Sequence, residues 1–231
     1  NSTGERRHNI RFKINTKLLD RVTLASNVGY TTTKVTSPVS SLTSGGGAIY
    51  NAMRIAPNAP LRFTDGSWAY GGGNTNPVAT LYDGGRIKTD ADELSIMEVV
   101  KVDLLKGWDV SATYNITSYN GLKDILKKTI TFVNPEDGAT NTYQSPNSIK
   151  NIDYKNIQQT FILQTNFDFN FGKHNLSGVV GMSQEWYTGR SFEASRNNLS
   201  TEYEPTLSLL FMGNQIRLRP FELQLERKIS A

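Results

Sequence analysis

The sequence predicts an all-β chain that forms part of an antiparallel transmembrane β-barrel. We expect about six strands, short periplasmic turns, long extracellular loops and an incomplete barrel. Three observations predict this class: polar and apolar residues alternate in six segments, tight turns alternate with long connections, and no apolar run approaches the ~20 residues of a spanning helix. A mean hydropathy of -0.43 fits a barrel, because only alternate residues of a barrel strand face lipid.

The clearest alternation lies in residues 157–187. Apolar side chains, mostly phenylalanines, share one parity up to Phe171, and amides with Asp168 hold the other. Successive side chains of a strand point to opposite faces, so this segment has one apolar face and one polar face. The chain then reverses at Gly172-Lys173-His174 and runs out again through Trp186. The segment is therefore predicted to be a membrane hairpin.

Four further segments repeat the alternation: residues 8–18, 22–30, 96–105 and 108–119. Each is roughly as long as a tilted membrane strand. Tight reversals are expected at Leu19-Asp20-Arg21, Lys106-Gly107 and Gly172-Lys173-His174, and long connections at 31–95, 120–154 and 189–215. Short turns at one rim and long loops at the other are typical of outer-membrane barrels. Residues 48–55 predict a short helix, whereas 121–128 fit either a helical turn or a strand.

Composition argues against several function classes. The net charge of +4 is spread along the chain without a Lys/Arg block, so no nucleic-acid partner is expected. The chain has no cysteine, which excludes disulfides and thiolate metal sites. The two histidines, His8 and His174, lack evident partners for zinc or for a Ser-His dyad. Glycines 45–47 and 71–73 lack the sequence context of a phosphate loop.

Carboxylates offer two further possibilities. Glu93, Glu98, Asp103 and Asp109 could supply an acid/base pair, but scattered strand carboxylates are more often solvated or lumen-facing, so we expect no enzyme. Residues 90–93 carry three carboxylates that could hold Ca²⁺, against the alternative of a polar loop. The favoured expectation is therefore no metal, no catalytic residue and no cofactor.

Aromatic residues suggest two kinds of contact. Trp108, Trp186 and Tyr187 fall near predicted strand ends, where a girdle at the membrane interface is expected. Tyr50, Trp68 and Tyr70 lie in the longest predicted loop. Their rings could stack on a sugar or pack against a lid protein, and the alternative is that they hold the loop together.

Four phrases resemble the barrel of SusC/RagA-type TonB-dependent outer-membrane transporters, the nutrient importers of Bacteroidetes. They are RHNIRFKINTKLLDRVTLASNVGYTTTK, AMRIAPNAPLRFTDGSWAY with the later Asn76-Pro77, FDFNFGKHNLSGVVGMSQEWY and EASRNNLS, and they span roughly Arg7 to Gln215. The resemblance implies a barrel of about 22 strands with a plugged lumen. It also implies outer-membrane lipid around the barrel, coupling to TonB, a SusD-like lipoprotein lid, and oligosaccharide or peptide cargo.

The chain departs from this family in what it contains. We find no signal core, plug or TonB box, and only a minority of the strands. Residues 1–215 are therefore expected to be a partial receptor barrel, a fragment of the importer. Two alternatives stay open. A self-contained small outer-membrane barrel or porin would need ~8 strands, and a soluble β-rich carbohydrate-binding module is disfavoured by the phenylalanine face.

Residues 216–231, IRLRPFELQLERKISA, break the pattern where another strand is due. Back-translated with suitable codons and read from the second base, they give YAFGRLNYNWKEKYLL, which resembles the family's next hairpin. We therefore expect 216–231 to be an out-of-frame tail that follows a frameshift near Gln215.

Overall fold

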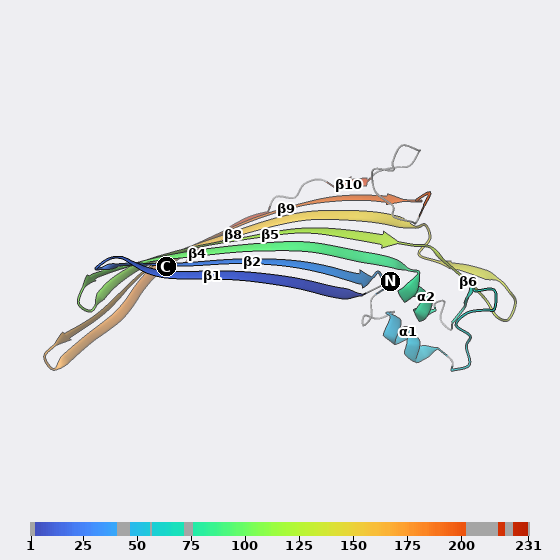
Figure 1. Cartoon of the computed structure of the whole chain (residues 1–231), viewed down its shortest axis with the longest axis horizontal. Coiled ribbons are helices and arrows are strands. Elements are labelled where there is room, and N and C mark those ends of the chain that lie inside the picture. The colour runs from blue at the N-terminus through green and yellow to red at the C-terminus, as the bar shows by residue number, and fades with distance from the viewer. Residues whose placement is uncertain are drawn as a thin grey trace.

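The computed structural model describes residues 3–40, 47–55, 57–71, 76–201, 217–219 and 224–230. Six long strands form one antiparallel sheet: β1 (Gly4–Leu19), β2 (Val22–Pro38), β4 (Gly85–Leu105), β5 (Trp108–Lys127), β8 (Ser148–Phe171) and β9 (His174–Asn197). Each lies beside the next along the chain, in the order β1-β2-β4-β5-β8-β9 (Figure 1). The predicted set of about six antiparallel strands is confirmed.

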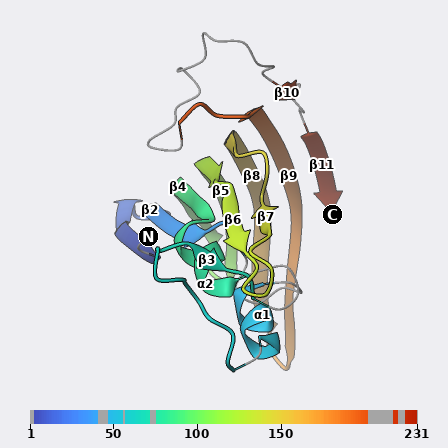
Figure 2. The ribbon, with the colours of Figure 1, turned by 90° about the vertical axis from the view of Figure 1, so that its right-hand side faces the viewer.

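Two short strands follow the long ones. β10 (Arg217–Arg219) and β11 (Gln224–Ser230) both pair antiparallel with β9. Among the described strands, none pairs with the outer edge of β1. Figure 2, seen from the loop end, shows the sheet as an open curved wall. The described strands thus do not close into the small barrel that the sequence left open.

Three tight turns join the strand pairs at one end of the sheet, as predicted (Figure 1). Gly107 has φ 80° and Gly172 has φ 64°, a conformation that glycine adopts without steric cost. The Gly107 position is also crowded, since a Cβ there would lie 2.1 Å from the Asp168 carbonyl oxygen. The turn sequences therefore fix where the hairpins reverse. We call this side of the sheet the turn end and the opposite side the loop end.

The strands extend well beyond the predicted segments, which corrects the predicted loops. β1 has 16 residues and β8 and β9 have 24 each. Parts of the predicted loops are strand: 31–38, 85–95, 120–127, 148–154 and 189–197. Residues 121–127 continue β5, so the strand alternative holds there. These extensions carry polar residues on both faces, as at Thr32 and Thr33, so hydropathy does not reveal them while backbone pairing continues.

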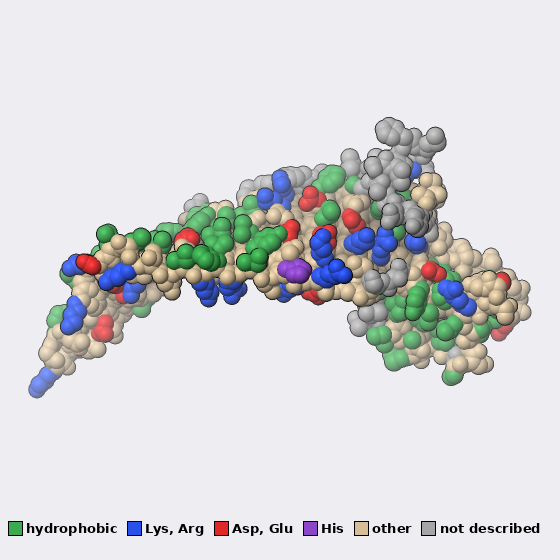
Figure 3. Space-filling view, in the orientation of Figure 1, with side chains coloured by type: hydrophobic (Ala, Val, Ile, Leu, Met, Phe, Trp, Pro, Cys, Tyr) green, Lys and Arg blue, Asp and Glu red, His purple; other side chains and the backbone are tan. Residues whose placement is uncertain are grey.

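The register divides the sheet into two faces, because directly opposed residues of antiparallel strands lie on the same side. One cross-strand row joins Leu24, Val100, Ala112, Leu163 and Met182. We call the side with this row the apolar face, and it appears as a green band in Figure 3. Along β2 it runs from Val22 to Tyr30, about 26 Å at ~3.3 Å per residue. That length matches the ~25 Å apolar band of outer-membrane barrels.

The other side is the polar face. Its rows include Asn27, Asn115 and Thr160, and the cations Arg11, Lys13 and Lys17 share it with Gln164 and Asn166. The predicted contrast between an apolar and a polar face is therefore present in the part of the sheet that the sequence had predicted to be strand. Polar side chains also occur on the apolar face: Gln159 and Gln184 lie there, and Glu98 accepts a hydrogen bond from the Ser26 hydroxyl on the neighbouring strand.

A small subdomain lies at the loop end. It contains α1 (Ala48–Arg54), β3 (Trp68–Ala69), α2 (Pro77–Tyr82), β6 (Ile130–Val133) and β7 (Thr140–Tyr143). β6 lies between β3 and β7, parallel to the first and antiparallel to the second. α1 matches the predicted helix, and Ala79, Ile130 and Phe132 form the buried core. No helix in the described ranges is long and apolar enough to cross a membrane.

Candidate functional site

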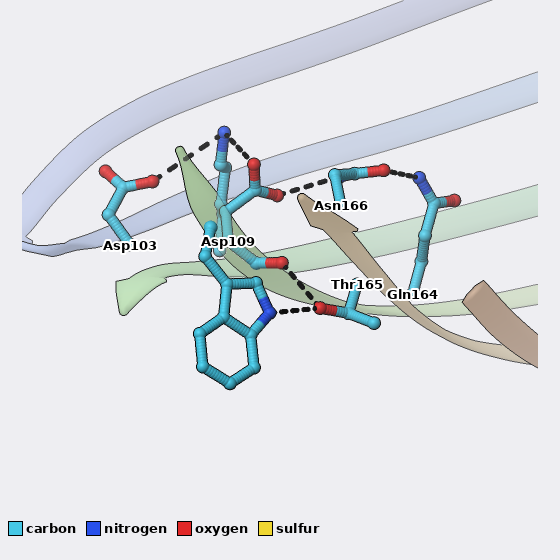
Figure 4. Close-up of polar contacts among 7 residues, drawn as sticks. Asp103, Asp109, Gln164, Thr165 and Asn166 are labelled. Atoms are coloured by element: carbon cyan, nitrogen blue, oxygen red, sulfur yellow. Dashed lines mark hydrogen bonds and ion pairs between the residues drawn. The ribbon is translucent and has the colours of Figure 1, made fainter. Parts of the chain in front are cut away.

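A chain of polar contacts lies on the polar face near the turn end (Figure 4). Asp103 and Asp109 stand directly opposite each other on β4 and β5. Facing like charges repel. The Lys101 ammonium offsets this, since its Nζ lies 3.7 Å from Asp103 Oδ1 and 3.4 Å from Asp109 Oδ1. One cation thus lies between two carboxylates at the strand ends and partly offsets their repulsion.

The contacts continue from Asp109 across to β8. Asn166 Nδ2 donates to Asp109 Oδ2 at 2.8 Å, and Gln164 Nε2 donates to Asn166 Oδ1 at 2.7 Å (Figure 4). Amide and carboxylate groups of three neighbouring strands are therefore connected to one another on this face. The sequence pattern put these amides on the polar face of the strand, and the register places them beside Asp109.

An open cleft of about 410 Å³ lies beside these contacts at the turn end, lined by Arg21, Asp103 and residues 104–109. Arg21 Nη1 donates to the Leu104 carbonyl at 3.1 Å, which ties the first turn to the second. The cleft is therefore formed by two neighbouring turns.

The register separates the three aromatics predicted at the membrane interface. Trp108 lies on the apolar face at the turn end, where its Nε1 donates to Thr165 Oγ1 at 2.8 Å. Trp186 also lies on the apolar face, opposite Gln159 in the middle of β9 rather than at its end. Tyr187 follows directly and therefore lies on the polar face, opposite Gln158. Strand alternation thus puts Tyr187 on the opposite side of the sheet from Trp108 and Trp186, and an interface role of the three stays a prediction.

The loop aromatics also separate. Trp68 and Tyr70 both pack against the core of the loop-end subdomain. The Trp68 Nε1 donates to Asp83 Oδ2 at 2.7 Å, and Arg62 lies over the indole, 3.5 Å from the ring centroid. Tyr50 is on α1, 41% exposed, and its hydroxyl accepts a bond from Arg54 Nη1 at 3.1 Å. Two of the three candidates thus have structural contacts, and Tyr50 has the more accessible ring.

Sequence reasoning did not single out Asn76 as the centre of this subdomain. The side chain is fully buried and makes four hydrogen bonds. Its Oδ1 accepts from the N–H groups of Val78 and Ala79, each at 3.1 Å, and its Nδ2 donates to the carbonyls of Leu61 and Ala69 at 2.9 and 3.0 Å. Asn76 therefore caps α2 and fixes two passing segments. The Asn-Pro pair was a usable signal, because this combination favours a helix start.

A tight turn precedes Trp68. The Ser67 hydroxyl and backbone N–H both donate to Asp65 Oδ1, at 2.6 and 2.9 Å. These bonds favour the ionised carboxylate and hold the pKa of Asp65 below its usual range. The turn sets the direction in which the chain enters β3.

A pair of tyrosines on the polar face was also missed. Tyr119 of β5 and Tyr154 of β8 stack with ring centroids 5.6 Å apart. Tyr154 lies over Gly121, directly opposite on β5, where a Cβ would lie 2.2 Å from the Tyr154 Cζ. Only the register could have revealed this aromatic–glycine pairing, because the two residues are distant in sequence.

The carboxylates of residues 90–93 are not gathered for calcium. Asp90 and Asp92 lie on the same side as the apolar face, and Glu93 lies on the other because it follows Asp92. Asp92 Oδ1 accepts from the Tyr30 hydroxyl at 2.8 Å, and Asp90 lies 3.7 Å from Lys34 Nζ. The described residues contain no cluster of metal-ligating side chains. The segment is strand, which corrects the expected polar loop.

The chain resembles known proteins in its structure. No family model matches the chain, and no curated protein matches it. Solved structures do match it, among them the following three. A chain of the RagAB peptide importer in its closed-closed state matches with a TM-score of 0.70 and 14% identity, over 98% of this chain and 25% of that one. The open-open state matches with a TM-score of 0.69 and 15% identity, over 97% of this chain and 24% of that one. A further RagAB peptide transporter structure matches with a TM-score of 0.70 and 14% identity, over 97% of this chain and 25% of that one.

The chain thus spans about a quarter of the length of the chains that it matches. At this identity the likeness concerns the fold. It agrees with the fold that the sequence phrases implied. This protein has the fold of a partial SusC/RagA-type barrel, an open antiparallel sheet of six long strands that matches part of the RagA barrel.

Proposed function

We propose that the chain is a wall segment of a SusC/RagA-like TonB-dependent importer in the outer membrane of a Gram-negative bacterium. The observation that carries this proposal is the two-faced sheet, whose predominantly apolar face is about as tall as a bilayer core. The likeness to RagAB over nearly the whole chain supports it. The apolar face contacts lipid, and the polar face lines the lumen.

The turn and loop ends give the proposed orientation. Outer-membrane barrels have short turns on the periplasmic side and long loops outside the cell. The turn end with Lys101 and Asp109 is then periplasmic, and the loop-end subdomain lies at the extracellular mouth. The exposed ring of Tyr50 is available there to cargo or to a SusD-like lid.

Cargo and energy coupling follow from the family and belong to the intact transporter. RagAB is a peptide importer, and the sequence resemblance extends the cargo classes to oligosaccharides. Coupling to TonB requires parts of a transporter outside these strands. The open edge of β1, and the part of β9 that β10 and β11 do not cover, need further strands, since a spanning sheet with unpaired backbone groups is not tolerated in lipid. This chain contributes wall and loops, and no catalysis.

Detergent dependence tests the proposal. The chain, expressed with an export signal, is expected to be insoluble alone, and to give a compact, heat-modifiable band in SDS when co-expressed with the strands that complete the barrel. A chain that stays monomeric without detergent would identify a soluble module. A heat-modifiable band from the chain alone would identify a self-contained small barrel. Either result contradicts the wall-segment proposal.

We also propose that residues 1–215 are the barrel part and residues 216–231 an out-of-frame tail. The backbone pairing of β10 and β11 with β9 is compatible with either reading frame, because a β-ladder uses main-chain groups. Sequencing the gene decides the matter. Codons for 216–231 that encode YAFGRLNYNWKEKYLL from the second base support the tail, and codons that do not encode it refute the tail.

A further inference from the structure

Two cations face each other on the outer side of the wall. Lys155 of β8 stands directly opposite Arg190 of β9. The register puts both on the same side as the apolar face, two pairs along from Gln159 and Trp186. Directly opposed side chains have Cβ atoms about 4.5–5.5 Å apart, so facing like charges destabilise an antiparallel pair.

The structure offers these cations little compensation. Neither Lys155 nor Arg190 makes an ion pair within the described part of the chain. Asp153 lies two residues before Lys155 on the same side, opposite Phe192, and is not within ion-pair distance of either cation. Asp92 lies two strands away, on β4, and its carboxylate accepts a hydrogen bond from the Tyr30 hydroxyl. By contrast, the other facing pair on this side, Arg6 and Lys34, is offset by the Lys34–Asp90 contact.

The Lys155–Arg190 pair lies just beyond the loop-end border of the apolar face. Moving from the loop end toward the turns, Lys155 and Arg190 are followed by Ile157 and Thr188, and then by Trp186. Tryptophan rings favour the boundary between hydrocarbon and headgroups. The cations therefore lie just beyond the apolar band, at headgroup depth. Figure 3 shows basic side chains gathered on this face between the green band and the loop end.

We propose that Lys155 and Arg190 bind the phosphate of an anionic lipid in the outer leaflet. This inference rests on the proposed function, which puts the apolar face in the bilayer and the loop end outside the cell. A phosphate between the two cations would remove their mutual repulsion and accept charge-assisted hydrogen bonds from both. Asn120, next to Lys155 on β5, can add an amide donor. The acyl chains would then lie along Ile157 and Trp186.

Lipid A, a phosphate-bearing lipid of this leaflet, is the probe for the test. The intact barrel that contains this chain is placed in phosphatidylcholine nanodiscs, and its binding of lipid A is titrated by native mass spectrometry. Each basic residue near a charged membrane surface contributes about a fivefold step in affinity, so the double variant Lys155→Gln/Arg190→Gln is expected to bind about thirtyfold more weakly. The conservative variant Lys155→Arg is expected to retain binding.

The control removes the same charge at the same end of the sheet but from the opposite face. Lys123 and Lys127 lie on the polar face of β5, so Lys123→Gln/Lys127→Gln is expected to leave lipid A binding unchanged. Unchanged binding in the Lys155/Arg190 double variant, or an equal loss in the control, overturns the lipid site. Displacement of lipid A by inorganic phosphate at similar concentration identifies a free-anion site instead and also overturns it.

Failure of the two proposals can be told apart in the same experiment. A protein that inserts into the nanodiscs, but whose lipid A affinity does not depend on Lys155 and Arg190, overturns the lipid site alone. A protein that does not enter the bilayer at all overturns the proposed function, and the lipid site with it.

Discussion

The ring of Phe167 lies over Gly178 across the last long hairpin. The two residues are directly opposed on β8 and β9, and a Cβ on Gly178 would lie 2.5 Å from the Phe167 Cζ. Phe167 also stacks on Phe169, with ring centroids 6.3 Å apart. An aromatic ring that covers a glycine on the neighbouring strand shields the bare backbone and fixes the register. Tyr154 and Gly121 repeat the arrangement on the polar face.

Gly178→Ala is expected to destabilise the hairpin, because the new methyl group displaces the Phe167 ring. We expect a loss of about 1 kcal/mol, whereas replacing glycine by alanine in an unobstructed strand gains about 0.5–1 kcal/mol. Gly29→Ala is the control, since its Cβ meets only Arg11 Nε, at 4.0 Å. Heat-modifiability midpoints in SDS measure both. In a Phe167→Leu background the Gly178→Ala penalty should shrink, and a penalty that stays the same would rule out the ring contact as its cause.

Val99 and Val100 provide a matched test of the two faces. Val100 belongs to the apolar face, opposite Ala112, and Val99 to the polar face, opposite Thr113. Val100→Lys is expected to cost about 2–4 kcal/mol in a bilayer, because a lysine then faces hydrocarbon, and Val99→Lys is expected to cost much less. Denaturant titration of the intact barrel in lipid vesicles measures both. Equal costs would show that the two faces do not differ in their surroundings.

Asn76→Ala is expected to loosen the loop-end subdomain. The change removes the cap of α2 and leaves two carbonyls, on Leu61 and Ala69, without their donor. The expected local loss is about 3 kcal/mol. Hydrogen exchange of the Asp83 amide, which donates to Ala79 within the helix, should accelerate on the order of a hundredfold. Asn58→Ala, at an exposed position, should leave this exchange rate unchanged, and similar acceleration in both variants would refute the role of Asn76.

Lys101→Met is expected to expose the repulsion between Asp103 and Asp109. The lysine is about half exposed, so the loss should be modest, about 1 kcal/mol. The second change Asp103→Asn should restore most of it by removing one of the two facing charges. Lys106→Met, in the turn itself, serves as the charge-matched control. The thermal unfolding midpoint of the intact barrel is measured for Lys101→Met, for its combination with Asp103→Asn and for Lys106→Met. A loss of stability in Lys101→Met that Asp103→Asn does not relieve would contradict the proposed repulsion between the two carboxylates.

The sequence predicted the hairpins well where one face is apolar. At Phe161–Phe171 the contrast between neighbouring residues is large, so parity alone identifies a strand and its two sides. The strand ends were not predicted because this contrast between neighbouring residues is missing there. Around Lys155 and Asn156 both faces are polar, and the ladder that continues there uses main-chain groups that hydropathy does not report.

Grouping by residue type also had limits. Trp186 and Tyr187 are both aromatic, but adjacent residues of a strand cannot share a face. The loop-end subdomain depends on non-local contacts, such as the parallel pairing of Trp68 with Phe132, which no local pattern predicts. The facing pairs Lys155–Arg190 and Phe167–Gly178 likewise become visible only once the register is known.

The central claim is that one face of this sheet contacts lipid and the other contacts water. The chain has no cysteine, so single cysteines can be introduced at residues 110–115 of β5 and spin-labelled without background. Collision rates with oxygen and with a water-soluble nickel complex are then measured by electron paramagnetic resonance, with the intact barrel in lipid vesicles. Oxygen should be favoured at 110, 112 and 114, and nickel at 111, 113 and 115, with a period of two. Equal access to both reagents at all six positions would contradict the account.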